Sequence, residues 1–463
     1  MKDDFVTKNK GILYLILFVI ALITFFPLFN TGLGTADDFH YYMATREKEI
    51  MNDASFFAVT SGRFYYYFIK PVYNIPYLVD NMAVTKIFQF LPLVLCFLFF
   101  ARIVSKVTKS EEFAFFFLLL FLVTLQASKD TSLFIAYPFF FSFSFILLLA
   151  SFYLLMLFYE SRKRKHFAGS VVLFGLGLLF YETYILYLLF AFLAIVYYNF
   201  REETDVKGKI RKILLQMLPF VLVGAVYLAA YFIFRIYHPS QYAGTTFTTK
   251  HVTLRSFLKV LWGLSFTSFP LTVYQTSREM FHIKSELVAG YSPVVLSLLL
   301  ATKVEWLVKG ILVSFLGFRL LGILPRLQMK RWLAIAGTAV LLIFVPHIPM
   351  AYSEKYYFYV VEAGMKGYVT TFFSFFGTLL LITLLLAALA SLFSFHKIVK
   401  TAIISIAVFG IFICSMLTDY SNYMVARDIH SANLRFYALD DLMKTDEFKS
   451  IPPGSPFFGP TLY

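Results

Sequence analysis

The chain has 463 residues, of which 59% are hydrophobic and 20% aromatic, and its mean hydropathy is +0.73. A soluble domain is close to half apolar, so a water-soluble core could not bury this much apolar surface, and the composition predicts one polytopic membrane unit. The net charge is +14, and the two cysteines, Cys96 and Cys414, lie in apolar runs, which argues against a disulfide or a zinc site.

Hydrophobic runs long enough to cross a bilayer predict the membrane-spanning helices. The run 167–199 is too long for one span, and Gly175 and Gly177 fall near its middle, so we predict two helices that meet near Tyr181 and Glu182. This gives an all-α fold with about 11 transmembrane helices. The runs are 11–29, 87–104, 113–128, 138–159, 167–199, 213–235, 305–324, 332–350, 368–394 and 400–418.

The charges between these runs predict the topology. With the N-terminus inside, the inner segments carry 21 of the 41 Lys and Arg residues but only 8 of the 27 acidic residues. Because cytoplasmic loops are enriched in Lys and Arg, this asymmetry predicts a cytoplasmic N-terminus and explains the excess positive charge without nucleic-acid binding. No small-x-small cleavage site follows the first run, which we interpret as an uncleaved signal anchor. The inner segments are 1–10, 102–112, 160–166, 200–212, 319–331 and 396–400.

The long segments lie on the outer side in this topology, at 31–86 and 236–304, and a tail at 419–463 follows the last span. Long loops in a compact protein are usually functional, so we predict that the working face is outside. We divide the chain into a transmembrane domain, 1–418, and the tail, 419–463, which is either a simple extension or the start of a small outer domain.

Two adjacent acids, Asp37 and Asp38, follow the first span in a chain where charge is scarce. Thr35 precedes Asp38 by three residues, a capping-box-like spacing that predicts a short surface helix over 36–51. Acids at a helix start are favoured by its dipole. The pair is a candidate general base for a hydroxyl, or a candidate oxygen site for Mg²⁺ or Mn²⁺. The alternative is a pair of ordinary capping acids in a solvated loop.

The segment 61–70 combines basic and aromatic residues. If it is helical, Arg63, Tyr66, Tyr67 and Lys70 share one face. Such a face at the membrane surface suits a lipid phosphate, since Arg forms charge-assisted hydrogen bonds with it. An interfacial aromatic belt in contact with lipid headgroups is the alternative.

Glu182 lies within an apolar run, where an acid at the bilayer centre costs roughly 2.5–3.5 kcal/mol. An acid in such a place is a functional candidate, and a hydrogen-bonded structural acid is the alternative. Lys129 and Asp130, after the third span, either pair with each other, bind phosphate and a substrate hydroxyl, or are only solvated turn residues. The other charges deep in predicted spans are Arg235, Lys309 and Arg319.

The last outer cluster contains His347, Glu354, Lys355 and Tyr356. A lone histidine beside proline, such as His347, is more often structural than functional. The chain contains no P-loop, dinucleotide fingerprint, HExxH motif or nucleophile elbow, which argues against ATP-driven chemistry.

These features together resemble the GT-C superfamily of membrane glycosyltransferases, which use polyprenyl-phosphate sugars as donors. Asp37–Asp38 occupies the place of the family's first acidic motif, and Ser128–Lys129–Asp130 loosely matches its second. Tyr181–Glu182 is similar to a Tyr-Glu element of bacterial members. Glu354–Lys355–Tyr356 is similar to an element that usually has Arg at the middle position, and Lys there weakens the case for bidentate phosphate binding. The likeness in layout covers most of 1–420.

The resemblance implies an inverting transfer in which an acceptor hydroxyl attacks the anomeric carbon and the lipid phosphate leaves. It implies that Asp37 or Asp38 acts as the base or as a metal ligand. It further implies that Arg63, Lys129 and Lys355 hold the phosphate, and that Glu182 binds a sugar or acceptor hydroxyl. The remaining expected substrate-binding residues are His40, Tyr67, Asp130, Glu354 and Tyr356.

We therefore expect a hexosyltransferase-like enzyme of the cytoplasmic membrane that modifies a surface glycan or lipid on the outer face. Its expected partners are a polyprenyl-phosphate-linked sugar, the acceptor and membrane lipids, with no nucleic acid. Two alternatives stay open. A transporter or flippase for a lipid-linked or polar solute should show related halves and polar residues at the midplane. A non-catalytic envelope-assembly protein predicts that the outer acids do not converge.

Overall fold

The computed structural model describes residues 5–33, 36–79, 81–127, 139–201, 205–245, 252–270, 272, 302–392 and 396–452. The regular elements within them are helices, as predicted. In this described part, nine helices are long and apolar enough to cross a membrane, so the chain is a multi-pass membrane protein. They are α1 (Phe5–Phe25) with its 3₁₀ extension, α5 (Met82–Thr108), α7 (Phe140–Ser161), α9 (Leu188–Asn199) with the preceding η3 (Glu182–Tyr187), α10 (Val206–Tyr237), α14 (Val304–Ile323), α15 (Met329–Phe344) with η6 and α16, α18 (Thr371–Leu392) and α19 (Lys397–Met443).

Within the described residues, two shorter helices, α6 (Glu111–Thr124) and α8 (Arg164–Leu178), complete the eleven helices expected from the hydrophobic runs. At 14 residues, α6 is about 21 Å long, which is less than the bilayer core. Every residue of α6 from Phe113 onward is buried, and the helix contacts α1, α5, α14, α18 and α19. It is apolar all round because protein surrounds it, as expected for the central helix of a bundle.

Phenylalanine rings fill the space between α5, α6, α7 and α18. Phe97 stacks on Phe121, with ring centroids 3.3 Å apart, and on Phe376 at 4.3 Å. Gly377 lets α18 approach α15 closely, since a Cβ there would lie 2.5 Å from the carbonyl oxygen of Ala339. Much of the aromatic content of the chain is therefore helix packing.

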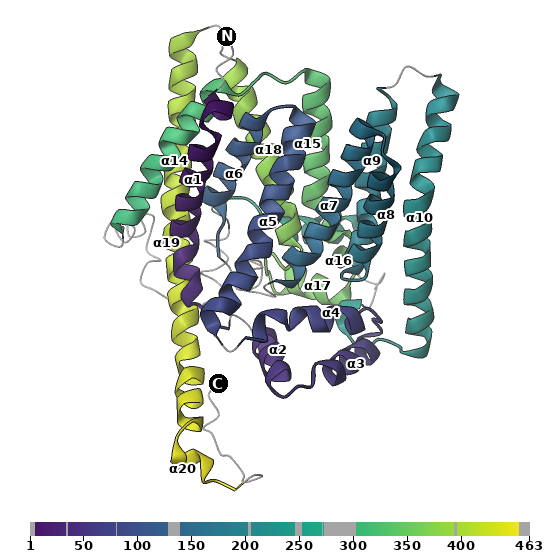
Figure 1. Ribbon diagram of the computed structural model, residues 1–463, viewed down its shortest axis with the longest axis vertical. Helices are drawn as coiled ribbons and strands as arrows, with labels where there is room; N and C mark the ends of the chain where they lie inside the picture. The colour runs from purple at the N-terminus through teal and green to yellow at the C-terminus, as the bar shows by residue number, and fades with distance from the viewer. Residues whose placement is uncertain are drawn as a thin grey trace.

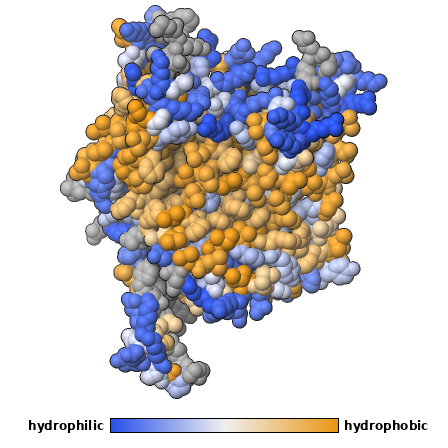
Figure 2. Space-filling model, in the orientation of Figure 1, coloured by the Kyte–Doolittle hydropathy of each residue, from blue (hydrophilic) through white to orange (hydrophobic). Residues whose placement is uncertain are grey.

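Three short helices lie across the end of the bundle opposite the N-terminus (Figure 1). They are α2 (Ala36–Arg46), α3 (Ile50–Ser61) and α4 (Tyr66–Tyr73), and we call this part of the molecule the α2–α4 end. Figure 2 shows an apolar band around the middle of the molecule with hydrophilic residues above and below it. The other elements are η1 (Phe26–Asn30), η2 (Ile75–Tyr77), η4 (Ala243–Thr245), α11 (Leu254–Phe266), η6 (Val345–His347), α16 (Ile348–Ala351), α17 (Glu354–Tyr357), the π-helix η7 (Phe358–Glu362) and α20 (Asp446–Lys449).

The last long helix, α19, is one continuous element of 47 residues. The expected division between a transmembrane domain and a tail at 418 therefore falls inside a helix and not at its end. Asn433, beyond that point, donates hydrogen bonds to the carbonyl oxygens of Thr31 and Leu33, both at 2.8 Å. The tail thus begins as an extension of the bundle that fixes the connection leading towards α2.

Candidate functional site

The predicted surface helix after the first span is present, and α2 begins at Ala36, so that Asp37 and Asp38 lie in its first turn. It ends at Arg46 rather than at 51, and α3 follows. Asp38 is 1% exposed and accepts a hydrogen bond from the hydroxyl of Tyr77 at 3.3 Å. The side chain of Asp37, like Thr35 as a whole, lies outside the described residues.

The surroundings of Asp38 are closed and polar. Lys86 of α5 is buried beside it and interacts electrostatically with its carboxylate. Burial, together with the charge of Asp38, raises the pKa of Tyr77 well above its ordinary value. Lys86 is a competing cation beside Asp38, so the described residues around this acid do not fit a divalent cation. Within the described part of the chain, no three His, Cys, Asp or Glu side chains gather to hold a metal ion.

The prediction that Arg63 shares a helix face with Tyr66, Tyr67 and Lys70 is wrong, although the last three do lie together in α4. Helix α3 ends at Ser61, Gly62 adopts φ = 64°, and α4 begins only at Tyr66, so Arg63 lies in the connection. A Cβ at Gly62 would lie 2.7 Å from the carbonyl oxygen of His238, so the turn at this position requires glycine.

Lys70 does not face the surface. Its ammonium is fully buried, bonds Asp53 of α3 at 2.8 Å and lies 3.7 Å from the ring centroid of Phe57. A buried cation needs such a partner, but Asp53 lies 17 residues from Lys70 in sequence, so helix periodicity does not reveal the pair. Tyr67 contacts α3 as well, since its hydroxyl lies 3.4 Å from that of Ser55.

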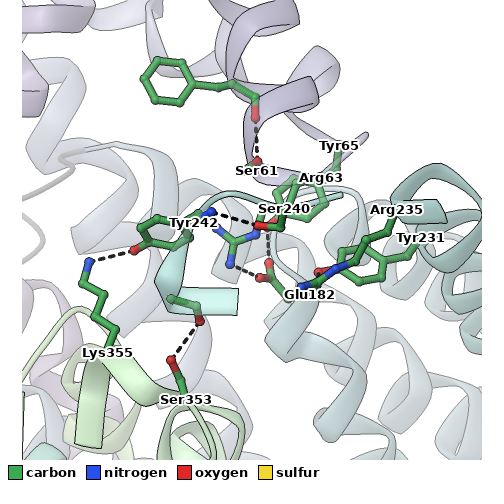
Figure 3. A network of polar contacts seen from close by, with 12 residues as sticks. Ser61, Arg63, Tyr65, Glu182, Tyr231, Arg235, Ser240, Tyr242, Ser353 and Lys355 are labelled. Atoms are coloured by element: carbon green, nitrogen blue, oxygen red, sulfur yellow. Dashed lines mark hydrogen bonds and ion pairs between the residues drawn. The ribbon is translucent and has the colours of Figure 1, made fainter. Parts of the chain in front are cut away.

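Arg63 instead binds Glu182. Its Nη2 donates to Oε1 at 2.5 Å, and the hydroxyl of Tyr65 donates to the other carboxylate oxygen (Figure 3). Glu182 begins η3, just after α8 ends at Leu178, so the predicted helix break at this acid is confirmed. The side chains of Arg63 and Glu182 are 13% and 23% exposed, so the pair is partly open to solvent.

Tyr242 brings a second cation into the same network. Lys355 of α17 donates to its hydroxyl at 2.8 Å, and the guanidinium carbon of Arg63 lies 5.4 Å from its ring centroid (Figure 3). Ser353 donates to the carbonyl oxygen of Gly244 at 3.1 Å, which fixes the segment carrying Tyr242 against α17. Four segments far apart in sequence therefore meet at this network.

The network carries more positive than negative charge. Arg63 is paired with Glu182, whereas Lys355 forms no ion pair within the described residues. Burial would lower the pKa of Lys355, but Tyr368 and Tyr242 outweigh burial and raise it. Burial likewise opposes the charge of Arg63, but Glu182 and nearby tyrosines hold its pKa well above the ordinary value. Both cations therefore stay charged at neutral pH, opposite one carboxylate.

The other predicted residues are placed separately. Glu354 is exposed, and Tyr356 is buried with its ring 5.2 Å from that of Tyr368. His40 bonds Asp53, and Lys129 and Asp130 lie outside the described residues. Asp38 and Glu182 thus belong to two different clusters at the α2–α4 end, and Asp130 is placed in neither.

His347 is structural, as its setting beside proline predicted. Its ring is fully buried, with Nδ1 2.8 Å from the hydroxyl of Thr370 and Nε2 2.6 Å from that of Ser374. Ser374 gives its own proton to the carbonyl oxygen of Ile343, so it accepts from Nε2, and both ring nitrogens have partners inside the protein.

Sequence reasoning missed Tyr242, Tyr65 and Asp53. Tyr242 lies in a connection without periodicity, and 31 tyrosines in the chain give no reason to select it. Asp53 lies among mostly apolar residues of α3. An acid in such a segment is a weak indication of function, as it is for Glu182. Only the approach of distant segments distinguishes these residues from their neighbours.

Residues 36–363 match the family model of the glucosyl transferase GtrII. The chain belongs to this family. The match begins at the helix that carries Asp38 and contains all four segments of the Arg63–Lys355 network. No curated protein and no solved structure matches the chain. The family consists of GT-C-like polytopic membrane glycosyltransferases, so the expected class is confirmed and this family member is a membrane glycosyltransferase.

Proposed function

We propose that the protein transfers glucose from a polyprenyl-phosphate donor to a surface glycan or lipid, at the outer face of the cytoplasmic membrane. The observation that carries the proposal is the network of Arg63, Glu182, Tyr242 and Lys355 at the α2–α4 end, within a region that belongs to a glucosyl transferase family. Glucose is proposed because the family is one of glucosyl transferases. A lipid-phosphate donor is proposed because the network presents two cations.

The excess positive charge suits a lipid phosphate. Lys355 has no carboxylate partner among the described residues, and Nε of Arg63 is buried without a hydrogen-bond partner there. A phosphodiester donor carries one negative charge, and the lipid phosphate that leaves carries up to two. Cations that are already in place stabilise this developing charge without reorganising. Lys355 contributes a point charge, while the Arg63 fork offers directed N–H groups.

Glu182 suits hydroxyl groups of the donor sugar. Both of its oxygens already accept hydrogen bonds, from Arg63 and Tyr65, which fixes the orientation of the carboxylate. Each oxygen keeps a second lone pair for a sugar hydroxyl. The same two contacts hold the carboxylate of Glu182 close to the expected position of the phosphate.

The reaction is a single displacement. The acceptor oxygen forms a bond to the anomeric carbon, the bond from that carbon to the phosphate oxygen breaks, and the lipid phosphate leaves with the electron pair. The hydroxyl proton passes to a carboxylate in the first turn of α2, Asp37 or Asp38, and then to water. One displacement inverts the anomeric carbon.

Loop charge supports the outer face of the membrane for this site. The α2–α4 end lies opposite the N-terminus, and the basic loops predict that the N-terminus is cytoplasmic. In the proposed topology the network faces outward, and the prenyl chain of a donor would lie in the apolar band.

The test is transfer by the purified protein in lipid vesicles, with radiolabelled glucosyl polyprenyl phosphate and surface glycan from cells that lack the enzyme. We expect incorporation of label by the wild type and about a 100-fold loss in Lys355→Met, because a preorganised charge at the leaving group is removed. Lys366→Met, which removes an exposed lysine outside the network, is the matched control. Equal transfer by Lys355→Met and the control, or transfer from a nucleotide sugar alone, would overturn the proposal.

A further inference from the structure

Three side chains of the α2–α4 end form a chain of contacts that the donor network does not use. Nε2 of His40, on α2, lies 2.7 Å from one oxygen of Asp53, on α3. The other oxygen of Asp53 accepts from the ammonium of Lys70, on α4, at 2.8 Å. The side chains of His40, Asp53 and Lys70 are 48%, 8% and 0% exposed, so the chain runs from solvent into the interior.

The contacts fix which nitrogen of His40 carries the proton. Asp53 faces a fully buried ammonium, which requires an ionised partner, and a carboxylate only accepts hydrogen bonds. When the ring carries a single proton, that proton is therefore on Nε2, which donates to Asp53. Nδ1 then presents a lone pair, and it has no hydrogen bond among the described residues.

Packing holds the ring in this orientation. Phe57 of α3 and Tyr41 of α2 lie edge-on to it, with centroids 5.6 and 5.8 Å from the imidazole. Lys70 in turn lies over the same two rings, which fixes the far end of the chain. The lone pair of His40 is thus a prepositioned acceptor on the exposed side of α2.

Charge separates this group from the donor network. Lys70 and Asp53 cancel, so the chain is neutral overall, whereas the Arg63–Lys355 network has excess positive charge. A lone pair repels a phosphate oxygen but accepts from a hydroxyl. Three aromatic rings connect His40 with the Arg63–Lys355 network. The ring centroids of Phe57 and Tyr66 are 5.8 Å apart, and those of Tyr66 and Tyr65 are 5.5 Å apart. The hydroxyl of Tyr65 then donates to Glu182.

We propose that His40 belongs to the acceptor subsite, where Nδ1 accepts a hydrogen bond from a hydroxyl of a neutral glycan. Asp53 and Lys70 are positioning residues that hold the imidazole. The inference rests on the proposed function, and it assigns a glycan, rather than a charged lipid headgroup, as the acceptor. Sugar hydroxyls meet this requirement.

The test is steady-state transfer by the full-length protein, with surface glycan from enzyme-deficient cells varied at saturating donor, and glucosyl polyprenyl phosphate varied at saturating glycan. His40→Ala should raise the KM for glycan about tenfold, the value of one hydrogen bond, and leave kcat and the donor KM unchanged. His40→Gln, which keeps an acceptor, should recover part of the loss. His396→Gln, an exposed histidine before α19, is the matched control.

The possible failures are distinguishable. If the wild type transfers no glucose, the proposed function fails. If the wild type is active but His40→Ala keeps the wild-type glycan KM, or raises the donor KM instead, the acceptor subsite is refuted. A fall in kcat with unchanged glycan KM also refutes it, since that result assigns His40 to proton transfer. Apparent melting temperatures of both variants should equal the wild type, because the ring is half exposed.

Discussion

Two ion pairs in this protein have similar geometry and opposite settings. Arg63 and Glu182 are 2.5 Å apart and partly exposed, within a network that extends to Tyr242 and Lys355. Lys309 of α14 and Asp419 of α19 are 2.6 Å apart and completely enclosed, at 0% and 1% exposure. Ion-pair distance alone would rank them as equals.

The enclosed pair is a link between helices. Lys309 has no exposed surface, and the nearby apolar cluster of Trp306, Met416 and Tyr420 joins the same two helices. No surplus charge is left for a ligand, because each partner neutralises the other. The Arg63–Glu182 pair differs because a second cation, Lys355, lies across Tyr242 without a carboxylate of its own among the described residues. Solvent exposure and surplus positive charge, and not the presence of a buried acid, distinguish a candidate binding site from a structural ion pair.

The largest expected effect is on the enclosed pair. Lys309→Met leaves Asp419 buried without its cation, which should cost about 3–5 kcal/mol of stability. The double variant Lys309→Met/Asp419→Leu should recover most of the loss, because a well-packed apolar pair often replaces a buried ion pair at little cost. The measurement is the apparent melting temperature in detergent. A double variant as unstable as the single one would show that the charges have a further role.

The partly exposed pair should respond in activity instead. Glu182→Gln removes the carboxylate that orients Arg63 and binds the sugar, so transfer should fall about 100-fold, while stability changes by less than about 1 kcal/mol. Glu362→Gln, an exposed acid after α17, is the control and should transfer at the wild-type rate. A large loss of stability with normal specific activity would instead class Glu182 with Asp419.

Gly62 tests how strictly the position of Arg63 is held. Gly62→Ala places a side chain at φ = 64° and against the His238 carbonyl, so it should cost roughly 1–2 kcal/mol and reduce transfer about tenfold. Gly337→Ala, at a helical glycine with open space around it, should have no such effect. If Gly62→Ala retains full activity, the Arg63 loop tolerates displacement, and the network is less preorganised than we infer.

The smallest expected effect is that of chelation. Because Lys86 is a competing cation beside Asp38, and we propose that Arg63 and Lys355 hold the phosphate, transfer should be unchanged within a factor of about two by excess EDTA. The measurement is the initial rate before and after dialysis against the chelator. Loss of activity that Mg²⁺ or Mn²⁺ restores would assign a metal to the site and contradict this division of roles.

The sequence determined the class of the fold because hydropathy and loop charge act locally. The helix break at Glu182 and the start of α2 at Ala36 followed from the same local signals. The partners of the charged residues could not be predicted from local signals. The contacts of Arg63 with Glu182 and of Lys309 with Asp419 join segments more than 100 residues apart. Lys70 shows the limit most clearly, because a surface helix face was predicted where a buried cation lies.

The central claim is that the surplus cations at the α2–α4 end bind the phosphate of a lipid-linked donor. A structure of the protein with a bound polyprenyl-phosphate analogue tests it most directly. We predict phosphate oxygens within hydrogen-bond distance of Arg63 and Lys355, with the prenyl chain in the apolar band. A phosphate bound at the opposite end of the bundle, or at the α2–α4 end without contact to either cation, would contradict the account.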